Sequence, residues 1–501
     1  MEVKSIPRPF RRGRELPPEP ESDAAAPHAP APAGNDGDPR LRWARGLVWL
    51  FFGLLLVEGS LRKWLLPGLS TPLLLIRDPV VLGIYALAWS AGVVPRNGFL
   101  LGLAGLALLS VPVGLLQMAA GMTTLPVLLY GLRTNFLYLP LIFVLPAIFR
   151  RADVVSLGRW VLLLALPMAV LMFLQFSVPP THRLNAAIGD GLQISSTMGR
   201  VRPAATFSFI SGPIAFFALV TAFLTLGFYA RGSYSLRMTS CAGAGLAVAL
   251  AVSGSRSALV STVLVFVAFL VGLIATGQAG RVVATVTKLA VVGLVLGVAL
   301  LQSGVLKEGI EVFTLRWAQA SEFESESGGM VGRILGEVLG PFRQMIELPV
   351  LGLGLGRGTN VGAALLGSPG AFLLAEGEWG RVLLENGPFL GPMVLGYRVV
   401  LVAWMAVTAL RASRRGELLP LLLFAACGTL LFNGPFGQPT TLGFATLVAG
   451  LSLASLDRAG ASEDPVPAPA APPPPVEPPP PRRAFRKPAR KVAAGQPPSA
   501  A

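Results

Sequence analysis

Apolar runs separated by short polar or Gly/Pro-containing breaks fill the middle of the chain. A helix of about 20 apolar residues crosses a hydrocarbon core of about 30 Å, and most of these runs approach that length. The chain is therefore expected to be all-α, a polytopic helix bundle in a membrane. The pattern predicts about twelve spans, at 44–57, 72–93, 98–120, 124–149, 155–178, 204–229, 239–253, 257–276, 288–304, 387–410, 418–432 and 437–456.

The longest break, residues 305–386, is predicted to form one large loop that carries short helices. Within it, the stretch 331–348 repeats apolar residues near helical spacing, and Gly340-Pro341 is expected to break or kink that helix. We expect the helix to lie on the outer membrane surface. Its apolar positions are Ile334, Leu335, Val338, Phe342, Met345 and Ile346.

The two tails, residues 1–42 and 457–501, have a different composition. Pro, Ala and acidic residues dominate the first, and a long Pro-rich stretch precedes a basic patch at 482–491 in the second. Such chains cannot bury enough apolar surface to offset the entropy lost on ordering, so both tails are predicted to be disordered. The membrane domain is predicted to span residues 43–456.

The overall composition excludes a soluble globular enzyme, because 53% of the residues are hydrophobic and only 13% are charged. The formal net charge is +15, of which residues 1–40 and 457–501 together supply only +2. Lys and Arg beside membrane spans are an ordinary topology signal, so no nucleic-acid binding is expected. Two cysteines, Cys241 and Cys427, cannot define a disulfide framework.

The basic residues of the short connections predict the orientation of the chain. With a cytoplasmic N-terminus, every second connection is basic, which follows the positive-inside rule. Both tails are then cytoplasmic, the protein lies in the cytoplasmic (inner) membrane, and the connections 179–203 and 305–386 are external. The cytoplasmic residues are Arg96, Arg150, Arg151, Arg159, Arg231, Arg237, Arg281, Lys288, Arg411, Arg414 and Arg415.

Cations on the predicted external side oppose the positive-inside rule. They therefore say more about function than the cytoplasmic cations do. A guanidinium matches a phosphate group bidentately, so an anionic ligand is one explanation; pairing with a carboxylate such as Glu58 or Glu385, or simple solvation, is the other. For the whole set we predict a phosphate or diphosphate site. The set is Arg62, Lys63, Arg183, Arg200, Arg202, Arg256, Arg316, Arg333, Arg343, Arg357 and Arg381.

Arg256 is the most informative of these cations. It lies in SGSRSAL, where Gly and Ser separate two apolar runs that form two spans or one broken span. An ionisable residue at such a depth is a functional candidate. Arg77-Asp78 and Arg133 also lie in apolar surroundings, where an internal ion pair or a polar contact between helices explains them at least as well.

Three segments together resemble the O-antigen ligase and polymerase superfamily. RVRPAATFSFISGPIAFF (200–217) is similar to the family's Arg and turn at the head of a span, and SGSRSAL (253–259) to its Ser-Arg-Gly/Ser-Ala motif. PVLGLGLGRGTN (349–360) with EGEWGRVLLENGPFLG (376–391) resembles the end of its large external loop. EGSLRKWLLP (58–67) and LLLIRDPVVLGIY (74–85) resemble a less characterised branch, which favours polymerase-like chemistry over lipid A ligation.

The resemblance implies a glycosyltransferase that takes glycan from an undecaprenyl-diphosphate-linked donor, outside the cytoplasmic membrane, and passes it to a glycan or lipid acceptor. Glu376 stands where the family has a histidine, so Glu376 or Glu378 is the candidate general base. A salt-bridged helix start is the alternative interpretation of Glu378-Trp379-Gly380-Arg381. No cofactor or metal is required. The predicted diphosphate ligands are Arg200, Arg202, Arg256 and Arg381.

Two other function classes fit the same cations. A transporter or flippase of a lipid-linked saccharide or another anion would also line its path with arginines, although the halves show no internal repeat. A scaffold within a polysaccharide assembly complex would not depend on them. GLGLGRG (352–358) lacks the strand and helix of a dinucleotide site and is predicted to be a tight turn, and the acidic Glu322, Glu324 and Glu326 are typical of a solvated loop.

Overall fold

The apolar runs of the sequence form helices, as predicted. The computed structural model describes residues 38–188, 199–230, 232–277, 280, 282–284, 286–287, 304–325, 329–367 and 377–456. In these residues the chain is helical and contains no β-strand. The predicted tails, apart from a few residues at their inner boundaries, lie outside the described residues, as does nearly all of the predicted span 288–304.

The other eleven predicted spans each correspond to a helix or a helix pair in the described part of the chain. Near the N-terminus they are α1 (Pro39–Ser60), α2 (Asp78–Ser90), α3 (Gly98–Ala119), the pair α4 (Leu125–Leu132) and α5 (Leu141–Ile148), and α6 (Arg151–Ser177). They continue with α7 (Ser211–Tyr229), α8 (Leu236–Ser253), α9 (Arg256–Ala275), α14 (Glu378–Arg414), α15 (Leu419–Asn433) and α16 (Pro439–Ala454).

Eight helices in the described residues are long and apolar enough to cross a membrane. The count becomes nine if α4 and α5, which are bent by 47° relative to one another, form one broken span. The apolar helices α15 and α16 are shorter. The chain is therefore a multi-pass helical membrane protein, and the full count of twelve spans stays a prediction.

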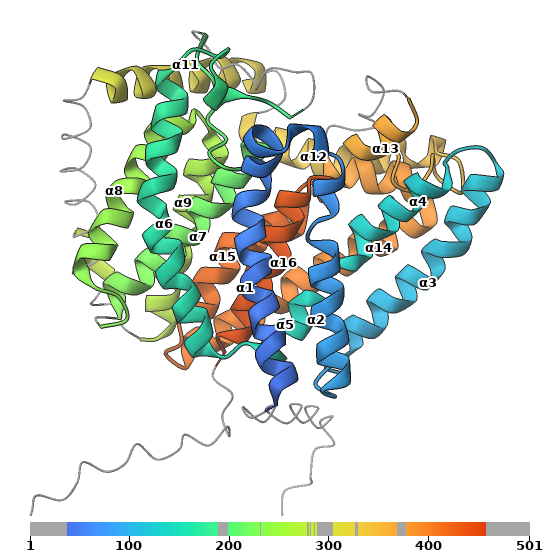
Figure 1. Ribbon diagram of the computed structural model, residues 1–501, viewed down its shortest axis with the longest axis horizontal. Coiled ribbons are helices and arrows are strands. Elements are labelled where there is room, and N and C mark those ends of the chain that lie inside the picture. Colours follow the sequence, from blue (N-terminus) through green and yellow to red (C-terminus); the bar gives the residue numbers. More distant parts are fainter. Residues whose placement is uncertain are drawn as a thin grey trace, which may run out of the picture. The chain divides into compact units, whose positions relative to one another are not determined.

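Successive helices run in alternate directions, so the connections gather at two ends of the bundle (Figure 1). We call one end the loop end. It carries the connections 61–77, 120–124 and 434–438 and the described parts of 178–210 and 304–377. Both Asp38 and Leu456 lie at the opposite end, which places the two tail junctions together. That this opposite end faces the cytoplasm remains a prediction from charge.

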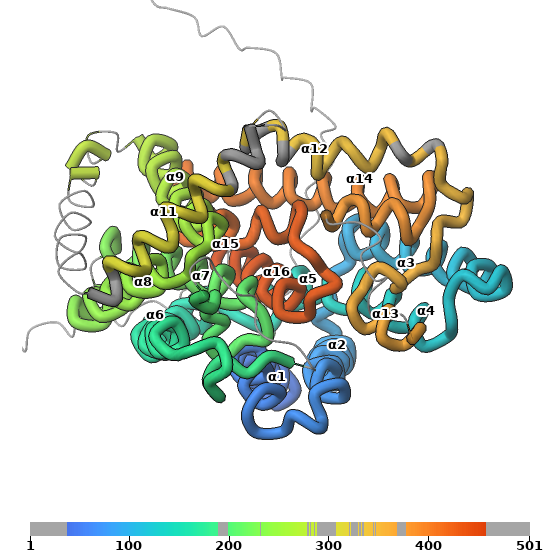
Figure 2. The backbone as a smooth tube through the Cα atoms, turned by 90° about the horizontal axis from the view of Figure 1, so that it is seen from above, coloured from blue at the N-terminus to red at the C-terminus, as the bar shows by residue number. Residues whose placement is uncertain are grey.

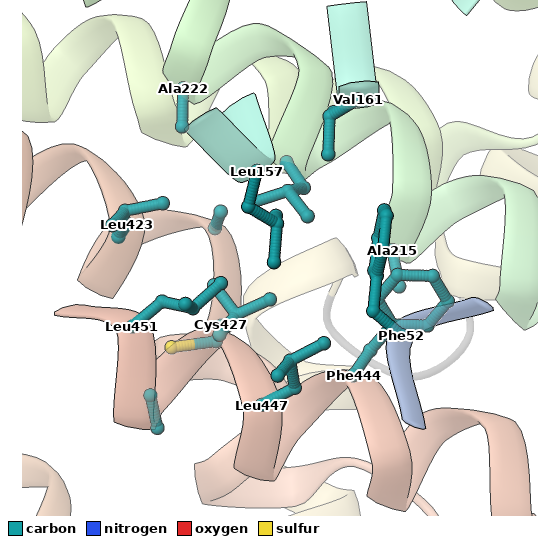
Figure 3. Close-up of a cluster of buried hydrophobic side chains, with 14 of the residues drawn as sticks. Phe52, Leu157, Val161, Ala215, Ala222, Leu423, Cys427, Phe444, Leu447 and Leu451 are labelled. Atoms are coloured by element: carbon teal, nitrogen blue, oxygen red, sulfur yellow. The ribbon is translucent and has the colours of Figure 1, made fainter. Parts of the chain in front are cut away.

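Helices α7, α15 and α16 form the centre of the bundle and pack against one another and against α5, α6 and α14. Figure 3 shows this core, in which Phe52 of α1, Leu157 of α6 and Ala215 of α7 meet Cys427 of α15 and Leu447 of α16. Helix α3, by contrast, leaves Leu101 and Leu108 more than 70% exposed. A bundle whose outer helices expose leucine is suited to lipid as its solvent.

The predicted large loop is mostly helical where it is described. It contains α11 (Gly304–Ser325), α12 (Gly329–Gln344), the 3-10 turn Met345–Glu347 and α13 (Asn360–Leu365), which lie across the loop end (Figures 1 and 2). The predicted helix at 331–348 is confirmed as α12, and Gly340-Pro341 does not end it. Glu322 and Glu324 belong to α11, so the loop expected there is wrong, because the amphipathic α11 continues to Ser325; Glu326 lies outside the described residues.

Candidate functional site

A small pocket opens at the loop end between α6, α7, α8 and α9. Pro203, Ile210 and Ile214 line one side of it, and Ser253, Ser255 and Ala258 line the other. These residues come from the segments 200–217 and 253–259, which the fold therefore brings together. The segment SGSRSAL is a turn between two separate helices rather than a break within one span, because Gly254 adopts a left-handed conformation (φ 54°) that ends α8.

Two helices begin at this pocket. Helix α7 starts at Ser211 and α9 at Arg256, and neither Ile210 nor Ser255 caps its helix with a side-chain hydrogen bond. The first turn of α9 therefore directs backbone N–H groups and the positive end of its helix dipole toward the pocket region. Helix α7 contributes mainly its dipole, because the Gly212 N–H bonds to the Phe209 carbonyl at 3.1 Å and Pro213 has no N–H. Two such helix starts beside one pocket favour negative charge there.

The predicted ligands Arg200 and Arg202 flank the pocket on its α7 side. Arg202 precedes the lining residue Pro203; it is half-buried, and its Nε is buried without a hydrogen-bond partner in the described residues. Arg200 is engaged, because its Nε and one terminal nitrogen each donate to Glu308 of α11 at 2.7 Å. Of the two, Arg202 has the guanidinium that offers donors to a ligand.

Helix α11 contributes aromatic and basic groups on the α9 side of the same pocket. The guanidinium of Arg256 lies 5.9 Å from the ring centre of Trp317, and Arg316 donates to the carbonyl of Gly254 at 3.2 Å. Burial lowers the pKa of Arg316 from its usual value. The pocket therefore has Arg202 on one side and Arg256 and Arg316 on the other.

The segment EGSLRKW at the end of α1 holds the chain around Arg202 in place. Lys63 donates to the carbonyl of Ala205 at 2.7 Å, and Arg62 donates to the hydroxyl of Ser208 at 3.2 Å. Ala205 has a positive φ of 50°, and Gln175 accepts its backbone N–H at 2.8 Å. Sequence reasoning identified Arg62 and Lys63 as external cations, whereas the structure uses them to fix the 200–208 segment.

Four buried charged residues form a second group at the start of α14, which we call the α14 ionic cluster: Glu378, Arg381, Glu385 and Arg398. Arg381 donates to both oxygens of Glu378 at 2.8 and 2.9 Å and to Glu385 at 2.6 Å. Arg398 donates to Glu378 at 2.8 Å. All four side chains are at most 5% exposed.

The hydrogen bonds of this cluster favour the salt-bridged helix start over a chemical role for its members. Arg381 directs its donors at Glu378, Glu385 and Asn135, and Glu378 also accepts the backbone N–H of Phe436 at 3.2 Å. Neither the carboxylate of Glu378 nor the guanidinium of Arg381 is directed at the pocket beside Arg202. The other candidate base, Glu376, lies outside the described residues.

The glycine-rich segment 349–360 forms turns, as predicted, and these turns pack on α14. Leu353 donates its N–H to the carbonyl of Leu384 at 2.7 Å, and Gly358 donates to the carboxylate of Glu385 at 2.8 Å. Gln117 of α3 bridges them, since it donates to the carbonyl of Glu385 and accepts the N–H of Leu355, both at 2.8 Å. The two parts of the third sequence motif therefore form one unit.

Gly387 makes this contact possible and provides a test of it. Its φ of 75° is unfavourable for any residue with a Cβ, and a Cβ there would lie 2.6 Å from the backbone nitrogen of Gly352. We expect Gly387→Ala to lower the free energy of unfolding by about 2 to 4 kcal/mol. Thermal unfolding of the purified protein in detergent measures this, with Gly396→Ala as the control.

Gly396 is a matched control because it lies in the same helix and has open space around its Cα. Alanine there is expected to raise stability by up to about 1 kcal/mol, through helix propensity. Equal unfolding temperatures for the two variants would contradict the packing described for Gly387.

The connection 434–438 links the α14 ionic cluster to the pocket region. Phe436 donates its N–H to Glu378, and the ring of Phe436 lies 3.9 Å from the guanidinium carbon of Arg398. Two residues later, Gln438 accepts the hydroxyl hydrogen of Ser211, the first residue of α7, at 2.8 Å. The three motif segments therefore lie near one another at the loop end. The connection 434–438 joins the α14 ionic cluster to the start of α7 beside the pocket.

Sequence reasoning missed Glu308, Trp317 and Gln175, the partners of Arg200, Arg256 and the Ala205 segment. Glu308 and Trp317 belong to α11, and only its amphipathic pattern could have indicated a helix there. In the described residues no group of His, Cys, Asp and Glu side chains is arranged to hold a metal ion. Comparison of the chain with models of known protein families, with curated proteins and with solved structures finds no match in any of the three.

Proposed function

We propose that the protein is a membrane glycosyltransferase of the O-antigen ligase or polymerase type, which takes glycan from an undecaprenyl-diphosphate-linked donor at the outer face of the cytoplasmic membrane. The observation that carries this proposal is the pocket at the loop end, where the starts of α7 and α9 lie beside Arg202 and Arg256. The resemblance of the segments around this pocket to the superfamily supports it.

The chemistry of a lipid-diphosphate donor fits this arrangement. In the transfer, an acceptor hydroxyl oxygen bonds to the anomeric carbon of the donor sugar, the bond from that carbon to the diphosphate oxygen breaks, and the hydroxyl proton passes to a base. The leaving diphosphate gains negative charge as the bond breaks. Arg202, Arg256 and the two helix starts would stabilise that charge, which is often the largest contribution to catalysis.

The surroundings of the pocket indicate where the lipid chain of the donor and the acceptor would bind, and which residue would take the proton. The pocket lining is mostly apolar, with Met172, Phe217 and Leu250 among its residues, so the lipid part of the carrier would approach the diphosphate site along this apolar side. Helices α11 and α12 lie across the loop end, where a glycan acceptor would approach. The sequence offers Glu376 or Glu378 as the proton acceptor, and the proposal takes Glu376, because Glu378 is engaged by Arg381, Arg398 and Phe436.

The test is transfer by the purified full-length protein in detergent, with a lipid-diphosphate oligosaccharide as donor and a second oligosaccharide or a lipid as acceptor. We expect extended or transferred glycan and released undecaprenyl diphosphate, with no membrane gradient present. Absence of transfer, together with movement of the same donor across the bilayer of proteoliposomes, would contradict the proposal and identify a flippase. Absence of both activities would favour a scaffold.

A further inference from the structure

A second group of buried charges lies at the loop end, between α1, α2 and α4. We call it the Arg77 cluster; its members are Glu58, Arg62, Arg77, Asp78, Tyr130, Arg133 and Tyr138. Two of its arginines lie on π-helical segments, Arg62 on Leu61–Leu65 and Arg133 on Arg133–Leu137. Single turns of π-helix are rare in proteins, and those that occur are often found at functional sites. The two π-helical turns therefore make this cluster a candidate ligand-binding site.

The three arginines of this cluster form ion pairs with two carboxylates. Arg133 pairs with Asp78 through two hydrogen bonds of 2.7 and 2.8 Å, which is one of the explanations that the sequence left open for these residues. Arg77 Nε lies 2.8 Å from an oxygen of Glu58, and Arg62 lies 3.4 Å from the other oxygen. Glu58 is thus shared, and one positive charge of the cluster has no carboxylate of its own.

Four donor atoms of the cluster have no acceptor in the described residues. They are both terminal nitrogens of Arg77, one terminal nitrogen of Arg133 and the hydroxyl of Tyr130, all buried. Arg77 is completely inaccessible to solvent, with 0% exposure. A buried charged donor without a partner costs several kcal/mol, so a chain that retains this set is expected to use it.

Arg133, Tyr138 and Asp78 connect these groups into one network. The guanidinium carbon of Arg133 is 5.2 Å from the ring centre of Tyr130 and 5.2 Å from that of Tyr138. The hydroxyl of Tyr138 donates to Asp78 at 2.6 Å, and Asp78 follows Arg77 in the chain. Lys63, also buried and next to Arg62 in the chain, donates to the backbone carbonyl of Ala205.

We propose that Arg77, Tyr130 and Arg133 bind the phosphate of a membrane lipid headgroup. After their pairing with Glu58 and Asp78, the two guanidinium groups and the phenol still have donors without an acceptor in the described residues, and the guanidinium fork matches phosphate oxygens. This site is separate from the pocket beside Arg202 and does not depend on the proposed transfer reaction.

A lipid is the source that the surroundings favour. The segment that joins α1 to α2 covers the cluster and exposes four leucines, and Figure 2 shows α1 and α2 at the edge of the bundle. Leucines exposed at the end of a membrane span contact the ends of the acyl chains nearest the headgroups, so the phosphate groups lie directly beyond them. The four are Leu65, Leu66, Leu69 and Leu75, exposed by 65, 43, 51 and 45%.

The experiment measures lipid binding to the full-length, delipidated protein in detergent by native mass spectrometry. The probes are phosphatidylglycerol, diacylglycerol with the same acyl chains, and inorganic phosphate. We expect phosphatidylglycerol to bind at least tenfold more tightly than either of the other two. Equal binding of phosphatidylglycerol and diacylglycerol would overturn the proposal, and phosphate that binds as tightly as phosphatidylglycerol would overturn the lipid source.

Variants assign the binding to this cluster. Tyr130→Phe removes one hydroxyl and no internal hydrogen bond, and we expect it to weaken phosphatidylglycerol binding about tenfold, as the loss of a hydrogen bond to a charged group does. Arg77→Lys keeps a cation for Glu58 but loses the fork, and the same loss or a larger one is expected. Unchanged binding in Tyr130→Phe and Arg77→Lys would overturn the assignment.

Two controls separate this site from other parts of the protein. Tyr397 of α14 also has a buried hydroxyl without a partner, but no unpaired guanidinium contacts it in the described residues, so Tyr397→Phe should bind phosphatidylglycerol like the wild type. Arg256→Ala should also bind it normally, even if transfer is lost. A loss of phosphatidylglycerol binding in Arg256→Ala would place the lipid at the other pocket and overturn the proposal.

Discussion

Replacing Glu378 by Gln is expected to cost about 3 to 5 kcal/mol of unfolding free energy, because it leaves two buried arginines without their shared carboxylate. Arg381 and Arg398 both donate to Glu378, and its carboxylate is about 1% exposed. Glutamine keeps the size and one acceptor oxygen of the side chain but removes the negative charge. The yield of folded protein and its thermal unfolding temperature in detergent measure the effect.

The control is Glu308→Gln, which removes the partner of Arg200. This pair is about 30% exposed on both sides, where solvent screens the charges, so the expected loss is below about 1 kcal/mol. Equal destabilisation by the two substitutions would contradict the buried role assigned to Glu378. A Glu378→Gln protein that unfolds like the wild type but transfers no glycan would instead restore Glu378 as the general base.

The membrane helices could be predicted from the sequence because apolar length alone determines whether a segment spans a bilayer. Their ends were harder to predict where polar residues are buried. The span predicted to start at residue 387 corresponds to the part of α14 after Gly387, whose non-helical backbone (φ 75°, ψ −177°) separates it from a first helical part that starts at Glu378 and that the sequence analysis placed in the loop. Glu378, Arg381 and Glu385 are buried in the part of α14 before Gly387 because they pair with one another. A hydropathy pattern does not detect such pairing and therefore assigns these charged residues to a loop.

The candidate site was predictable only in part. Arg381 has its partners three residues before and four residues after it, on one helical face, so its internal pairing follows from local spacing. Arg200 has its partner 108 residues away, in a helix that the sequence analysis treated as loop. Which external arginine is paired and which offers its donors is therefore a tertiary property, and it distinguishes Arg202 from Arg200 and Arg381.

The same distinction predicts which arginine substitutions abolish function if the proposed transfer is correct. We expect Arg202→Ala to reduce transfer by about 10²- to 10³-fold, the usual cost of one donor that stabilises charge in a transition state. Arg256→Ala is expected to have a similar effect. Initial rates of transfer from a lipid-diphosphate donor, with the purified variants in detergent, measure both.

Two further variants show whether the loss reflects position and geometry rather than charge alone. Arg202→Lys keeps the charge but not the planar fork, so an intermediate rate is expected. Arg357→Ala removes an exposed cation that, among the described residues, donates to the carbonyl of Met122 at 3.4 Å, and it should transfer at the wild-type rate. If Arg202→Ala and Arg357→Ala retain equal activity, the pocket between α7 and α9 does not bind the diphosphate. The transfer rate would then not depend on whether the replaced arginine lies beside the pocket.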